Sequence, residues 1–171
     1  LFIFFFFCSK FKAMDHVDTA VTREFADIPA AAMWAVLSDW QAPYITAAGV
    51  GEAVLSTEGA GAGAKRTIGV GPTGATDPKL QFREELTALD DAGMTFAYRF
   101  CDGSEKPGGC PFPIANFVGK VSVAAKGDAG CSVTWGGSVD FTCPPAERPD
   151  LDALMGAFVA SAAALAQQQK K

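Results

Sequence analysis

Two kinds of hydrophobic periodicity divide this chain. From about residue 51 to residue 141, apolar and polar residues alternate with a period of two, which is typical of β-strands with one buried face. Clusters of glycine, proline and aspartate separate the alternating segments and predict turns. Strands are expected at Val54–Thr57, Lys65–Val70, Leu80–Leu89, Met94–Cys101, Phe117–Ala125 and Cys131–Phe141. Because short turns join them, they should form an antiparallel meander.

The two ends of the chain follow other patterns. Thr19–Phe25 predicts a first strand, and apolar residues around Trp34 and Tyr44 predict two short helices after it. From Leu151 to Gln169, apolar residues recur at helical spacing along one stripe. Such a helix would be about 28 Å long, enough to cross a sheet. The order of elements predicts an α+β fold, with a curved antiparallel sheet of about seven strands around a long C-terminal helix.

The length of 171 residues suits one domain with a substantial core. The first eight residues are all apolar, but they lack a basic segment and fall short of the ~20 residues of a membrane span. We therefore expect residues 1–13 to be a non-native or disordered segment, translation to start at Met14, and residues 14–171 to form the single domain. We expect no transmembrane anchor and a cytoplasmic location. Secretion is the alternative if residues 1–13 are the remnant of a signal peptide.

Charge and composition exclude several classes of function. The net charge of −5 and the pI near 4.8 argue against a nucleic-acid partner. The chain has one histidine, His16, and five cysteines without Cys-x-x-Cys spacing, so we expect no metal site and no histidine-based triad. Cys101 and Cys110 flank a loop and could form a disulfide in an oxidising compartment; free thiols are the favoured alternative. The pattern Gly69–Gly74 resembles a dinucleotide fingerprint, but a strand follows it, so we predict a hairpin turn and no cofactor.

Ionisable residues fall on the apolar side of two predicted strands. Arg66 and Glu84 lie directly opposite each other if Ile68 lies opposite Phe82, since side chains alternate with a period of two. Buried ionisable groups are costly unless they are paired. We therefore expect a salt bridge, which either fixes the sheet or orients the polar end of a ligand.

The next predicted hairpin extends this row of polar groups. A turn at Asp90–Gly93 places Phe96 opposite Leu86 and Tyr98 opposite Glu84. A face with several inward polar groups is more typical of a cavity lining than of a solid core.

Trp135 lies on the same face, opposite Val121, and is expected to be a core or cavity-wall aromatic. The C-terminal helix should close the cavity. The residues expected to contact a ligand are Arg66, Glu84, Tyr98, Trp135, Phe82, Phe96, Met155 and Phe158.

Several short motifs also occur in a specific order. They are Ile28-Pro29, Trp34–Trp40, Gly63–Ile68, Glu84–Asp90, Tyr98, Pro111–Pro113 and Val133–Trp135. Over Thr19 to Gln169, the chain resembles the START/Bet v 1-like helix-grip superfamily (SRPBCC), in its polyketide cyclase/dehydrase and lipid-transport branch. The resemblance implies a sheet curled around the C-terminal helix with an apolar cavity between them. Members carry lipids, polyketides, sterols and hormones, and some of them are enzymes.

Three functions are compatible with this sequence. The first is binding or transport of a hydrophobic small molecule, such as a lipid, a polyketide or a hormone-like compound. The second is a polyketide cyclase or dehydratase in which Glu84 or Tyr98 acts as general acid or base. The third is a receptor that closes over a ligand and then presents a surface to a protein partner. No residue is assigned a catalytic role from the sequence, because no matching histidine or lysine constellation is visible.

Overall fold

The computed structural model describes residues 14–71 and 80–169. In chain order its helices and strands are β1 (Asp15–Phe25), α1 (Ala30–Leu37), α2 (Pro43–Ala47), β2 (Glu52–Glu58), β3 (Lys65–Val70), β4 (Gln81–Asp90), β5 (Thr95–Cys101), β6 (Ile114–Lys126), β7 (Gly130–Phe141) and α3 (Leu151–Gln168). The predicted order of elements is confirmed. The predicted N-terminal segment 1–13 and part of the hairpin turn predicted at Gly69–Gly74 lie outside the described residues.

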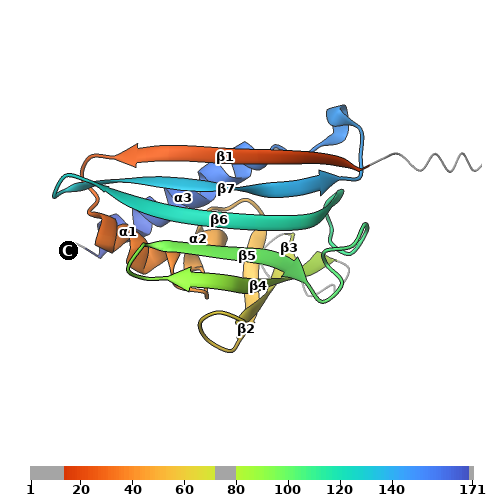
Figure 1. The fold of residues 1–171 in the computed structure, drawn as a ribbon, viewed down its shortest axis with the longest axis horizontal. Helices are drawn as coiled ribbons and strands as arrows, with labels where there is room; N and C mark the ends of the chain where they lie inside the picture. Colours follow the sequence, from red (N-terminus) through yellow and green to blue (C-terminus); the bar gives the residue numbers. More distant parts are fainter. Residues whose placement is uncertain (1–13, 72–79, 170–171) are drawn as a thin grey trace, which may run out of the picture.

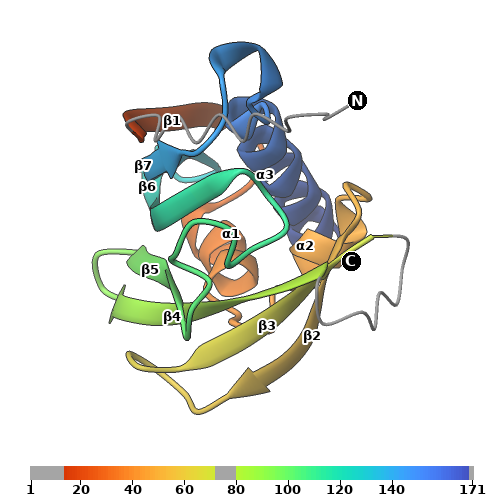
Figure 2. The same ribbon diagram turned by 90° about the vertical axis from the view of Figure 1, so that its right-hand side faces the viewer.

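The strands form one antiparallel sheet of seven strands in the order β1-β7-β6-β5-β4-β3-β2. The meander β2 to β7 is therefore continuous, and β1 closes it by pairing with β7 at one edge. Figure 1 shows the long strands β1, β7 and β6 lying in front of α3. Figure 2 shows that the sheet curves around α1 and α3, which lie on its concave side. This is the predicted α+β helix-grip architecture.

The long helix α3 forms because its sequence combines a strong start with an apolar stripe. The side chain of Asp150 accepts a hydrogen bond of 2.9 Å from the backbone N–H of Ala153, which caps the first turn. The buried face of the helix is formed by Met155, Phe158, Val159, Ala162, Ala163 and Ala166. Among the described residues, one segment, Pro145–Gln168, is long and apolar enough to cross a membrane by length and composition. Packing of α3 against α1, α2, β1 and β7 accounts for this apolar character.

The predicted register of β3 and β4 is confirmed. Arg66 pairs with Glu84, and Ile68 pairs with Phe82. All four side chains are buried. The apolar partners therefore fix the register that brings the two charges together.

The predicted register of β4 and β5 is wrong by two residues. Leu86 lies opposite Tyr98, and Glu84 lies opposite Phe100. The turn is longer than expected, because Met94 takes a left-handed conformation with φ 48° and the strand begins only after it. The ladder also shifts between Leu86 and Ala88. Tyr98 consequently lies diagonal to Glu84, although it remains on the inner face.

Several element boundaries also differ from the expectation. The first strand begins at Asp15 rather than Thr19, since it pairs with β7 along its whole length. Glu52 opens β2, two residues before the predicted strand. Leu80 was expected to begin a strand, but it lies outside β4 and is 40% exposed. Cys101 and Cys110 are free thiols, and the Cys110 Sγ lies 3.4 Å from the carbonyl oxygen of Phe112.

Candidate functional site

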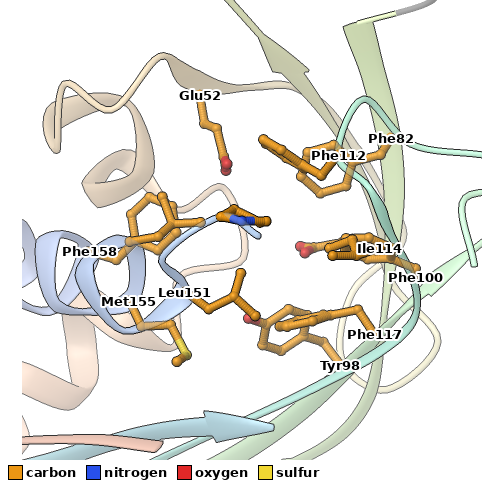
Figure 3. A pocket seen from close by; sticks show the side chains of 13 residues that line it. Glu52, Phe82, Tyr98, Phe100, Phe112, Ile114, Phe117, Leu151, Met155 and Phe158 are labelled. Atoms are coloured by element: carbon orange, nitrogen blue, oxygen red, sulfur yellow. The ribbon is translucent and has the colours of Figure 1, made fainter. Parts of the chain in front are cut away.

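A cavity of about 60 Å³ lies between α3 and the concave face of the sheet. Its volume is enough for several water molecules. It is lined by Glu52, Phe82, Glu84, Tyr98, Phe100, Phe112, Ile114, Phe117, Pro149, Leu151, Leu154, Met155 and Phe158. Figure 3 shows that aromatic rings from the sheet and from the loop before β6 face the α3 side chains across this space. The lining is therefore almost entirely apolar, with two carboxyl groups and one phenol.

The predicted ligand-contact residues divide into two groups. Five of the eight line the cavity, namely Glu84, Tyr98, Phe82, Met155 and Phe158. The other three, Arg66, Trp135 and Phe96, are buried next to it and do not line it. The Phe96 ring packs on Trp34 and Trp40, with centroids 6.1 and 6.4 Å away.

Arg66 and Glu84 form a buried ion pair on neighbouring strands. The Nε and Nη2 atoms of Arg66 each lie 2.7 Å from Oε2 of Glu84, and the two side chains are 1% and 5% exposed. Burial raises the pKa of the Glu84 carboxyl, and the guanidinium opposes that shift. Burial by itself lowers the pKa of Arg66, but Glu84, together with Tyr44 and Tyr98, outweighs burial and raises it. The two contacts keep both groups charged and direct the guanidinium at Glu84.

Two aromatic residues from the α1–α2 region enclose the guanidinium of Arg66. The Trp40 ring covers it with a distance of 3.9 Å from the guanidinium carbon to the ring centroid, a cation–π contact. Tyr44 is fully buried, and burial raises the pKa of its hydroxyl, an effect that the charge of Arg66 opposes. The Arg66 Nη1 atom and the Tyr44 hydroxyl make no hydrogen bond within the described part of the chain. Arg66 is thus covered by protein and does not reach the cavity.

Tyr98 is held in place by Trp135 and by a glycine. The Nε1 of Trp135 donates a 2.9 Å hydrogen bond to the hydroxyl oxygen of Tyr98. The Tyr98 ring lies flat over Gly119 of β6, where an added Cβ would come within 2.3 Å of the ring. Burial, and secondarily the charge of Glu84, raise the pKa of Tyr98 well above its ordinary value. The phenol therefore stays protonated, and its own O–H remains able to donate to a group in the cavity.

The sequence did not predict eight lining residues, namely Glu52, Phe100, Phe112, Ile114, Phe117, Pro149, Leu151 and Leu154. Glu52 is the polar one among them. It is 7% exposed and lines the cavity, and its carboxyl points into the space between Phe112 and Phe158 (Figure 3). Within the described residues, the carboxyl makes no hydrogen bond or ion pair. Burial and then the charge of Glu84 raise its pKa to about 7, while Arg66 opposes the shift. A signal existed in the sequence, because starting the strand two residues earlier places Glu52 on the same face as Val54.

The partly exposed lining residues lie on one side of the cavity. Phe112 belongs to the loop between β5 and β6, Pro149 precedes α3, and Leu151 and Leu154 belong to its first turns. The remaining lining residues are buried. A ligand would therefore reach the cavity between this loop and the first turns of α3.

Across residues 14–71 and 80–169, no group of three or more histidine, cysteine, aspartate or glutamate side chains could hold a metal ion. His16 lies on β1 and its Nδ1 contacts Asp140 at 2.7 Å, among exposed groups outside the cavity. The chemistry of the cavity depends on two carboxyl groups, a phenol and apolar surface.

Several solved structures share this fold. Norcoclaurine synthase from Thalictrum flavum is 15% identical with a TM-score of 0.62, over 89% of this chain and 87% of that chain. A Thermobifida fusca protein solved by NMR is 26% identical with a TM-score of 0.60, over 88% and 91%. An uncharacterised Bacillus thuringiensis protein is 16% identical with a TM-score of 0.59, over 91% and 100%. At the identities of the first and third, the likeness concerns the fold alone.

The family follows from the sequence match. No curated protein sequence matches the chain. The family model described as polyketide cyclase / dehydrase and lipid transport matches residues 16–169, nearly the whole described domain. The chain therefore belongs to the polyketide cyclase/dehydrase and lipid transport family, with a Bet v 1-like fold.

Proposed function

We propose that this protein binds or transports a hydrophobic small molecule in the cavity between α3 and the sheet. The observation that carries the proposal is an apolar cavity with an unpaired carboxyl group inside it. A ligand site combines mostly apolar walls with a few placed polar groups, and this cavity has that composition. Tyr98 supplies a donor and Glu52 and Glu84 supply acceptors, which would orient a polar end of the ligand.

The partly exposed residues around Leu151 support an entry route beside α3. Because the cavity is small, a ligand larger than a single ring requires Phe112 or Leu151 to move on entry. Both side chains are partly exposed, so they can move with less loss of packing than the buried part of the lining.

A blocked entrance tests the proposal. Native mass spectrometry of the purified protein should detect a co-purifying apolar compound, and Leu151→Trp should reduce its occupancy several-fold. Leu165→Trp is the matched control, because Leu165 is also a partly exposed leucine of α3 but does not line the cavity. Equal occupancy in both variants, with both folded, would argue against this cavity as the binding site.

An enzymatic function is the second candidate, and Glu52 is the observation that favours it. A general acid or base works best with a pKa near the working pH, and the pKa of Glu52 is raised to about 7. Together with Tyr98, it could move a proton in a cyclase or dehydratase reaction. The test is whether a compound recovered from the protein is converted on incubation, and whether Glu52→Gln abolishes the conversion while preserving binding. Recovery of the compound unchanged would favour a carrier.

A further inference from the structure

The ionisable residues that line the cavity favour one class of polar group on a ligand. Glu52 and Glu84 line it, and no lysine, arginine or histidine does within the described residues. The nearest cation, Arg66, directs its Nε and Nη2 at Glu84 and is covered by Trp40. An anionic ligand would therefore meet two carboxyl groups, while Arg66 pairs with Glu84 and lies outside the lining.

Glu52 differs from Glu84 in having no partner. Its side chain is more than nine-tenths buried and points into the cavity. The charged groups that act on it are Glu84 from β4 and Arg66 from β3, and Tyr98 from β5 lines the same cavity. None of these supplies a hydrogen bond to the Glu52 carboxyl, so its acceptor capacity is open to a ligand.

The walls of the cavity also suit a cation. Aromatic rings are attractive to positive charge at their faces. The rings that line the space belong to Phe82, Tyr98, Phe100, Phe112, Phe117 and Phe158. The same rings pack well against a flat apolar body.

We propose that the preferred ligand is an amphipathic amine, with its ammonium group against Glu52 and its apolar body among the phenylalanine rings. The inference rests on the proposed function, since it names the ligand class of the same cavity. An ammonium donates charge-assisted hydrogen bonds to the carboxylate, which are stronger than the neutral bonds of an alcohol. Desolvation of the ammonium offsets part of this gain.

Proton release follows from the same geometry. At pH 6 the free protein holds a proton on Glu52, because its pKa is about 7. An ammonium beside the carboxyl favours the ionised form, so binding of the amine expels that proton. A neutral alcohol has no such effect.

Calorimetric titration with benzylamine, benzyl alcohol and benzoate tests the inference. At pH 8 we expect benzylamine to bind about tenfold more tightly than benzyl alcohol, as a charge-assisted bond implies. Benzoate should bind most weakly. At pH 6, titration in buffers of different ionisation enthalpy should reveal proton release with benzylamine and none with benzyl alcohol.

Two variants distinguish an effect of the Glu52 carboxyl group from an effect of the overall charge of the protein. Glu52→Gln should remove both the amine preference and the proton release, while benzyl alcohol still binds. Glu58→Gln is the matched control, because Glu58 lies on the same strand and is exposed. If Glu52→Gln does not fold, the ratio of benzylamine to benzyl alcohol affinity in the unmodified protein at pH 8 still decides the question.

The outcomes distinguish the two proposals. Equal affinity for amine and alcohol overturns the amine assignment, and alcohol binding would still support a small-molecule site. Absence of binding by all three probes counts against the proposed function itself, and the amine assignment falls with it.

Discussion

Two parts of the inner face bury ionisable groups in opposite ways. Around Arg66 the charge is paired with Glu84 and covered by the Trp40 ring, outside the cavity lining. We call this the packed part. Around Glu52 the carboxyl has no partner in the described residues and faces a cavity. We call this the cavity part.

The difference separates structural from functional polar groups. In a buried ion pair with two short contacts, each charge is largely compensated by the other. Such a pair has little remaining capacity to bind a charged ligand. A buried carboxyl without a partner is kept at an energetic cost, which is typical of sites where function requires it. Burial with an unpaired atom does not by itself identify a binding residue, since Arg66 Nη1 and the Tyr44 hydroxyl also lack a partner within the described residues. We expect a binding residue where the unpaired polar group also faces the cavity, as Glu52 does.

Breaking the ion pair should give the largest effect. Arg66→Ala leaves Glu84 buried without a partner, which typically costs about 3–5 kcal/mol of the free energy of unfolding. Urea denaturation measures this loss. The double variant Arg66→Met/Glu84→Leu should recover much of it, since neither charge then remains to be desolvated.

An exposed ion pair on the neighbouring strands is the control. Arg99 contacts Glu85 at 2.8 Å, and the Arg99 side chain is 57% exposed. Arg99→Ala should cause a much smaller loss, because water screens and replaces this contact. A loss from Arg66→Ala no larger than that from Arg99→Ala would contradict the packed part as described.

Glu52 should make stability depend on pH in the opposite sense to a paired carboxylate. Its pKa is raised from 4.5 to about 7 in the folded protein. Between these values the folded state retains a proton that the unfolded state releases, so the free energy of unfolding falls as pH rises. The stability that the folded state gains from this proton is complete below pH 4.5 and lost above about 7.

Glu52→Gln should remove this dependence. Relative to the unmodified protein, the variant should gain about 3 kcal/mol of stability between pH 4.5 and pH 8. Thermal or urea denaturation across that range measures the difference. Glu58→Gln on the same strand is the control and should run parallel to the unmodified protein. If the stability of Glu52→Gln changes with pH as that of the unmodified protein does, the pKa of Glu52 is not raised by folding.

Gly119 leaves the space that the Tyr98 ring occupies when its hydroxyl contacts Trp135. Tyr98 lines the cavity, and its hydroxyl accepts a hydrogen bond from Trp135 in the core. In Gly119→Ala the new Cβ would lie 2.3 Å from the Tyr98 ring, so the ring must move. We expect a loss of about 1–3 kcal/mol, as for other overpacked cores, with a change in Trp135 fluorescence.

Gly156→Ala is the matched control for Gly119→Ala. Its added Cβ would lie 3.4 Å from the flexible end of Arg23. Alanine in a helix interior should stabilise α3 by about 0.5–1 kcal/mol. A destabilised Gly156→Ala, or an unaffected Gly119→Ala, would contradict the packing described here.

The sequence predicted the packed part better than the cavity part. The pairing of Arg66 with Glu84 followed from Ile68 and Phe82, because alternation fixes register wherever one face is buried. The position of Trp135 opposite Val121 followed in the same way. The helix α3 was predictable from its apolar stripe.

Local backbone irregularities account for what was missed. The left-handed Met94 and the shift between Leu86 and Ala88 moved Tyr98 away from Glu84, and periodicity carries no signal for either. Glu52 was missed because it follows Gly51, and a polar residue after a glycine is typical of a turn. Whether an inward side chain faces a neighbour or a cavity depends on packing across several elements, so Arg66 and Glu52 could not be told apart from the sequence.

The smallest expected effect is that of an isoleucine-to-phenylalanine substitution in the cavity part, which we compare with the same substitution outside it. Ile114 lines the cavity and Ile68 does not, and both are buried, at 3% and 1% exposure. Ile114→Phe places the extra atoms in empty space, so the free energy of unfolding should change by less than about 1 kcal/mol. Ile68→Phe has no such space and should lose about 1–3 kcal/mol.

Urea denaturation of both variants, with benzyl alcohol titration of Ile114→Phe, measures the contrast. Since a filled cavity cannot accept a ligand, Ile114→Phe should bind benzyl alcohol several-fold more weakly while it remains folded. Equal losses of stability from the two substitutions would mean that the cavity part is packed as tightly as the core, and the distinction between the two parts would fail.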